Sequence, residues 1–174
     1  MIIDHYFKKF GSPSREAEFS TQKNSIKVLK WDQDKTGEGV AIYATEGASN
    51  IHGDENNGCE FFLGIAPEVD DVVDAIAEAA LHGNGTLLIP NSGDSINLSY
   101  PLWVGTEAHS FMFTNGDEII EPINIVNKKI IFIQLVPIFE SELKYKNDHS
   151  EIDLWKRFEA LEVAYWNAKR KQAF

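Results

Sequence analysis

The sequence predicts an α+β domain built on one mixed, largely antiparallel β-sheet that is flanked by helices. Two observations predict this class. Segments typical of strands recur along the chain, at residues 25–31, 39–45, 59–65, 110–115 and 128–137. Amphipathic helical patterns lie before, between and after them, at residues 2–10, 67–82, 138–146 and 150–172. No internal repeat or long linker divides the 174 residues, so we expect residues 1–174 to form a single domain.

The N-terminal part of the chain predicts a short helix followed by strands. Ile3, Tyr6, Phe7 and Phe10 recur at helical spacing. The segments at 39–45 and 59–65 enclose a glycine- and asparagine-rich stretch, which is typical of a loop. This order predicts an antiparallel pair of strands joined by a long, exposed connection.

The next helix is expected to begin at Pro67 and to end at Gly83 and Gly85. Glu68 and Asp70 fall in its first turn, where the helix dipole favours carboxylates. Its apolar stripe is Val69, Val72, Val73, Ile76 and Ala80. Residues 85–90, GTLLIP, predict a short strand after this helix.

The later strands carry clearer signals. Asn115-Gly116 predicts a type I′ turn after the strand at 110–115. The nearly continuous apolar run at 128–137 predicts a central strand that is covered on both faces. Pro137 has no N–H to donate, so we expect it to end this strand.

A helical pair is predicted to complete the chain. Glu140 and Glu142 should lie in the first turn of a short helix, as part of a structural joint, and Glu142→Gln should perturb stability only slightly. Ser150, a good N-cap, should begin a long C-terminal helix that reaches about residue 172. Its buried stripe is expected to be Ile152, Trp155, Phe158, Leu161, Tyr165 and Ala168.

The net charge of −11 is concentrated in the middle of this acidic protein. Residues 32–121 hold 17 of the 27 acidic residues and only one base, Lys35. Such a segment repels nucleic acid and anionic membranes and attracts a cationic partner. Simple solubility is the other interpretation. No apolar run approaches the ~20 residues that cross a bilayer, and the single cysteine, Cys59, forms no internal disulfide, so we expect a cytoplasmic protein.

Catalytic motifs are lacking, and the sequence predicts neither a cofactor nor a metal. Cys59 is expected to be a buried, inert thiol. The best candidate for a metal site is the loop from His52 to Glu55, and the alternative interpretation is a solvated polar loop. Two carboxylate pairs are candidates for an acid and a base, namely Glu140 with Glu142 and Asp117 with Glu118. They could also be ordinary surface groups.

Most aromatic residues should lie in the core, and any that are left exposed would be binding anchors, because tryptophan and tyrosine dominate interface hot spots. Trp166 and Trp103 are the best candidates for exposed tryptophans. The residues predicted to bind a partner are Asp54, Glu55, Trp103, Asp117, Glu118 and Trp166.

Several segments, in order, resemble the Suppressor of Fused family between about residues 25 and 165. They are AIYATEGAS, CEFFLGI, VDDVVDAIAEAA, LLIPNS, HSFMFT and IIFIQLVPIFESELKYKNDHSEIDLWKRF. The last, with Pro137, Phe139, Glu142-Leu143 and Leu154, is the most similar.

The resemblance implies a non-enzymatic interaction domain of the single-domain bacterial type, with a mixed sheet between helices and no catalytic residues. It implies a protein partner, and the bacterial type includes immunity proteins that neutralise a cognate toxin, for which a basic toxin domain would suit the acidic middle. Two alternatives stay open. One is a regulator that sequesters a peptide or transcription factor by strand addition at a sheet edge, and the other is a hydrolase or metal-dependent enzyme that uses the His52–Glu55 loop.

Overall fold

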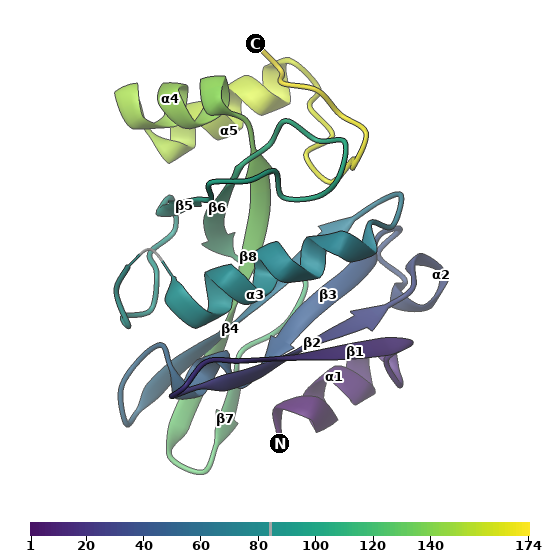
Figure 1. Ribbon diagram of the computed structural model, residues 1–174, viewed down its shortest axis with the longest axis vertical. Coiled ribbons are helices and arrows are strands. Elements are labelled where there is room, and N and C mark those ends of the chain that lie inside the picture. The colour runs from purple at the N-terminus through teal and green to yellow at the C-terminus, as the bar shows by residue number, and fades with distance from the viewer. Residues whose placement is uncertain (84) are drawn as a thin grey trace.

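The computed structural model describes residues 1–83 and 85–174, and it confirms the predicted fold class (Figure 1). One eight-stranded sheet has the order β1-β2-β3-β4-β8-β6-β5, and β7 also pairs with β8. Among the strands of the described residues, the β4–β8 pair is parallel and the other pairs are antiparallel. The strands are β1 (Arg15–Ser20), β2 (Ser25–Trp31), β3 (Ala41–Glu46), β4 (Asn57–Ile65), β5 (Ser95–Asn97), β6 (Ser110–Asn115), β7 (Ile123–Ile125) and β8 (Lys128–Ile138).

Helices cover both faces and one end of this sheet (Figure 1). They are α1 (Ile2–Phe10), α2 (Gln33–Thr36), α3 (Val73–His82), α4 (Glu140–Asp148) and α5 (Glu151–Ala160), with the 3₁₀ turns η1 (Ala48–Asn50) and η2 (Asp70–Val72). No helix among the described residues is long and apolar enough to cross a membrane.

Strand residues alternate between two hydrophobic cores, because successive side chains of a strand point to opposite faces. On β3, Tyr43 packs in the core beneath α3, whereas Ile42 packs in the core beneath α1. Tyr6 and Phe10 are the buried residues of α1, as the helical spacing predicted, while Phe7 is exposed. A third cluster joins α4 and α5 to the ends of β6 and β8.

The central position of β8 is confirmed, since it lies between β4 and β6 and is buried along most of its length. The strand ends at Ile138, one residue beyond Pro137. Glu140 and Glu142 lie in the first turn of α4, as predicted.

The predicted start of the helix over residues 67–82 is wrong, because α3 begins at Val73 rather than at Pro67. Ala66 stays extended, since its N–H donates to the Trp166 carbonyl (2.9 Å) and its carbonyl accepts from Ala168 (2.9 Å). The chain then forms η2 before the helix begins.

The predicted long C-terminal helix is also wrong, because α5 ends at Ala160. Residues 161–174 instead fold back beside Ala66 and α4. Leu161, predicted to be buried, is half exposed, whereas Ala168 is buried without a helix.

Two predictions about loops are also wrong. Residues 85–90 form no strand, and Leu87 and Leu88 are exposed. Asn115-Gly116 is not a type I′ turn, since neither residue has the positive φ that this turn requires. The Gly116 N–H donates to the Phe132 carbonyl (3.1 Å), so the chain runs along β8 instead of reversing.

Candidate functional site

Three loops converge at the end of the sheet where β4 and β8 begin. The β3–β4 connection contacts residues 85–88, because the Gly53 N–H donates to the Leu87 carbonyl (3.0 Å). It also contacts the β7–β8 hairpin, because the Lys129 N–H donates to the Asn56 carbonyl (2.8 Å). These loops lie along the lower left side of the molecule in Figure 1.

A buried carboxylate fixes the base of the β3–β4 connection. Glu60, which is fully buried, accepts hydrogen bonds from Thr45 Oγ1 (2.6 Å) and from the N–H groups of Gly47, Ala48 and Ser49 (3.0–3.1 Å). The inner part of the predicted exposed loop, residues 47–52, is mostly buried, whereas its outer part, residues 53–57, is exposed.

Asp54 and Glu55 are both exposed at the outer turn of this loop. Asp54 Oδ1 accepts from the N–H groups of Asn56 (2.7 Å) and Asn57 (2.8 Å). These backbone hydrogen bonds lower the pKa of Asp54, and the nearby Lys128 lowers it further. The turn therefore carries negative charge at neutral pH.

The two loops that contact this connection carry exposed apolar side chains. Leu87 is 62% exposed, Leu88 is 69% exposed and Val126, in the β7–β8 hairpin, is 93% exposed. Val126 has φ of 57°, which a β-branched residue rarely adopts, and it occupies the first position of the two-residue β7–β8 turn, where hairpin geometry requires a positive φ. We call Asp54, Glu55, Leu87, Leu88 and Val126 the loop surface.

Sequence reasoning found only the acidic half of this surface. The apolar pair at 87–88 was assigned to a strand, and no signal placed it near residue 53. Val126-Asn127 lies between two apolar segments that form a two-residue hairpin, and this spacing could have indicated a turn.

The other predicted acids, Asp117 and Glu118, are exposed immediately beyond β6. Their loop contacts β8 at Phe132, whereas the loop surface contacts it at Lys129. Three residues of a strand span about 10 Å, so this second acidic loop lies at the same end of the sheet.

The two predicted tryptophans lie elsewhere. Trp103 is only 6% exposed, so the expectation that it is exposed is wrong, while Trp166 is 44% exposed as expected. Trp166 lies beside Ala66, beyond the end of β4. Nine residues of strand, about 30 Å, separate it from the loop surface.

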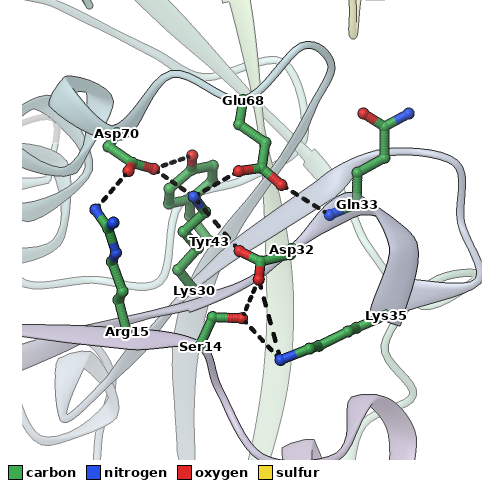
Figure 2. Close-up of polar contacts among 9 residues, drawn as sticks. All are labelled: Ser14, Arg15, Lys30, Asp32, Gln33, Lys35, Tyr43, Glu68 and Asp70. Atoms are coloured by element: carbon green, nitrogen blue, oxygen red, sulfur yellow. Dashed lines mark hydrogen bonds and ion pairs between the residues drawn. The ribbon is translucent and has the colours of Figure 1, made fainter.

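A charged network occupies the opposite end of β2 and β3 (Figure 2). Lys30, which is 6% exposed, lies with Nζ 2.6 Å from Asp70, 2.7 Å from Glu68 and 3.6 Å from Asp32. Tyr43 donates a hydrogen bond to Asp70 (2.9 Å). The network attaches the strands to the segment before α3.

The electrostatics of this network are those of a structural ion cluster. Burial lowers the pKa of Lys30, but hydrogen bonds and charge from Asp70 and Glu68 outweigh burial and raise it overall. The hydrogen bond from Lys30 in turn lowers the pKa of Asp70. Lys30 therefore stays protonated at neutral pH and is no nucleophile.

The candidate catalytic groups of the His52–Glu55 loop are not brought together. His52 is buried, its Nε2 lies 2.7 Å from the Ala80 carbonyl, and burial lowers its pKa. Asp54 and Glu55 face solvent instead. Within residues 1–83 and 85–174, no three His, Cys, Asp or Glu side chains could hold a metal ion. Cys59 is fully buried, as predicted, and burial raises the pKa of its thiol.

The Glu140/Glu142 pair is divided between two environments. Glu140 is exposed, whereas Glu142 is fully buried and forms a bidentate ion pair with Arg170 (2.7 and 2.9 Å). Both oxygens of Glu142 are occupied, so the geometry supports a structural role for this residue and no acid–base role.

The two outer strands offer little room for an added strand. β1 carries charged side chains at Arg15, Glu16 and Glu18, which protect a sheet edge. β5 has only three residues. The geometry therefore favours binding through the loops over binding at an edge.

Comparisons with solved structures support the same fold throughout the chain. A SUFU (suppressor of fused protein) homolog from Neisseria gonorrhoeae is 16% identical, with a TM-score of 0.75, and the match covers 99% of this chain and 94% of that one. A chain from the Sufu-Fu complex is 17% identical, with a TM-score of 0.64, over 99% and 91% of the two chains. Drosophila Suppressor of Fused is 16% identical, with a TM-score of 0.66, and the match covers 99% of this chain but 50% of that one.

No curated protein matched the sequence. The family model described as "Suppressor of fused protein (SUFU)" matches residues 22–171, which are most of the chain. The chain therefore belongs to the Suppressor of fused family.

Proposed function

We propose that this chain is a non-enzymatic protein-binding domain that engages a basic protein through its loop surface. The single observation that carries the proposal is that exposed Leu87, Leu88 and Val126 lie on the two loops that hydrogen-bond to the connection carrying Asp54 and Glu55. Apolar anchors beside a fixed charge are typical of interfaces, where burial supplies affinity and charge supplies specificity.

Two further observations support a protein partner. A relative was solved as the Sufu-Fu complex, which indicates that this fold can serve protein association. The acidic segment from residue 32 to 121 makes a basic partner the best complement.

A bacterial immunity role is the most specific form of the proposal. In that role the chain binds a basic toxin domain in the cytoplasm and neutralises it. The free, buried thiol of Cys59 suits a reducing compartment.

The experiment is a binding measurement with tagged products of neighbouring genes, at low and at high salt. For any partner found, the double variant Asp54→Lys/Glu55→Lys should weaken binding about tenfold or more, equivalent to about 1.4 kcal/mol, and should reduce its salt dependence. Leu88→Ser should raise the dissociation rate. Neutralisation of toxicity in a co-expression assay should fall in parallel.

The matched control is Asp148→Lys/Glu159→Lys, which makes the same charge change at exposed positions on α4 and α5. This control should bind as the parent does. Retention of no protein at either salt would end the proposal of protein binding, and equal effects of the two double variants would show that the loop surface is not the interface.

A further inference from the structure

A recess lies beside the beginning of α3, apart from the loop surface. Its volume is about 250 Å³. The lining residues are Asp71, Asp74, Tyr100, Pro101, Leu102, Trp103 and Val104. One wall comes from η2 and α3, and the other from residues 98–109, the arm that joins β5 to β6.

The arm is held rigidly, so the recess is formed before any ligand arrives. The Val104 N–H donates to Asp71 Oδ2 (2.6 Å), and the Leu102 N–H donates to the Ala108 carbonyl (2.9 Å). Leu102 and Trp103 are 1% and 6% exposed and belong to the core beneath α3. The burial that makes Trp103 a poor exposed anchor thus makes it a firm wall.

The charge at the recess is negative and unbalanced. Asp71 and Asp74 are exposed, and Glu78 follows one turn later on α3. Burial raises the pKa of Tyr100, and the charges of Glu78 and Asp74 raise it further. In the part of the chain that the structure describes, no lysine or arginine forms an ion pair with these three acids.

The aromatic and acidic residues that line the recess together favour one kind of side chain. Aromatic groups favour a flat cation over their faces, and carboxylates favour the paired N–H groups of a guanidinium. The volume is below the ~300 Å³ at which drug-sized ligand pockets begin, so it suits one long side chain. We propose that the recess receives an arginine side chain of the basic protein partner.

The recess and the loop surface can serve one partner. The far end of α3 adjoins the loop surface, since His52, in the β3–β4 connection, bonds to Ala80. The ten residues of α3 span about 15 Å, a distance that a single interface bridges. Asp74, Glu78 and His82, spaced four residues apart, lie on one outer stripe of the helix between the two. The inference rests on the proposed function, but its test does not require the partner.

The experiment is an NMR titration of the full chain with N-acetyl-arginine methylamide. N-acetyl-citrulline methylamide, which has nearly the same shape but no charge, is the control ligand. We expect saturable shifts of the Trp103 indole N–H and the Val104 amide with arginine, and at least fivefold weaker binding of citrulline. Added salt should weaken the arginine response.

Asp74→Asn tests the recess without dismantling the arm, because Asp74 is exposed and no hydrogen bond from it to the arm is found. It should weaken arginine binding at least threefold, whereas Asp117→Asn, an exposed carboxylate outside the recess, should not. Equal binding of arginine and citrulline, or equal effects of the two variants, would overturn the proposal. That result would not affect the proposal that a partner binds through the loop surface. Conversely, if the recess binds arginine but the chain binds no protein partner, only the proposed function is refuted.

Discussion

Replacement of Glu142 by glutamine should destabilise the protein strongly. The side chain is fully buried, and its two oxygens receive four donors: two from Arg170, one from the Phe139 N–H (3.0 Å) and one from the Ala173 N–H (2.9 Å). The Arg170 side chain is only 9% exposed, so it keeps a buried charge when its partner becomes neutral. The slight effect expected from the sequence assumed an exposed helix turn, and the burial of Glu142 removes that assumption.

The magnitude follows from the fate of that charge. Breaking a buried ion pair costs about 3–5 kcal/mol, and the Pro137 carbonyl, which Arg170 also binds (2.8 Å), compensates part of the loss. We therefore expect a loss of about 3 kcal/mol in the free energy of unfolding, out of the ~5–15 kcal/mol typical of a domain. For a chain of this length the loss corresponds to about 6–12 °C in Tm.

The assay is urea denaturation monitored by tryptophan fluorescence, with a double-mutant cycle. Glu142→Gln and Arg170→Met should each destabilise the protein, and the double variant should cost clearly less than the two losses added together. Glu140→Gln, an exposed carboxylate in the same helical turn, should change stability by less than about 0.5 kcal/mol. A loss below about 1 kcal/mol for Glu142→Gln would refute the reasoning, and so would abolished partner binding with an unchanged Tm.

Two further predictions concern pH and packing. Burial lowers the pKa of His52 in the folded state, so the unfolded state binds more protons than the folded state below about pH 6.5. The free energy of unfolding should therefore fall by up to about 1.4 kcal/mol as the pH is lowered from 7.5 to 5.5. In urea titrations, His52→Asn should weaken this pH dependence. An unchanged slope in that variant would assign the pH dependence to other groups. Gly116→Ala would place a Cβ 2.6 Å from the Phe132 carbonyl oxygen and in still closer contact with the Phe62 ring, so it should cost about 1–3 kcal/mol by overpacking, whereas a denaturation midpoint equal to that of the parent would show that the turn can shift freely.

The sequence predicted the elements whose signals are local. The apolar run of β8 and the helical spacing of Tyr6 and Phe10 needed no knowledge of distant residues, and both elements formed where expected. The C-terminal helix failed because distant contacts decide its length. The bridge from Ala66 to Asn167 and the ion pair from Glu142 to Arg170 draw the tail away from helical geometry.

The acids were predicted less well than the apolar residues, because a carboxylate does not reveal its partner. Glu68 and Asp70 were assigned to a helix dipole, yet they bind Lys30. Asp54 was correctly placed in an exposed turn, since glycine and asparagine surround it. The apolar residues Leu88 and Val126 join it only through the tertiary fold, so no local pattern could show that their loops contact the Asp54 loop.

The parallel contact between β4 and β8 has a consequence for how the chain folds. β1 to β4 are consecutive antiparallel neighbours that can pair by local closure, but Asn57 must find Lys129 across a long stretch of chain. Contacts between residues far apart in sequence slow folding, because the intervening loop loses entropy before the contact forms. We therefore expect the pairing of β4 with β8 to limit the folding rate. Substitutions along this pair should slow refolding more than substitutions between β1 and β2, and stopped-flow kinetics would reveal the difference.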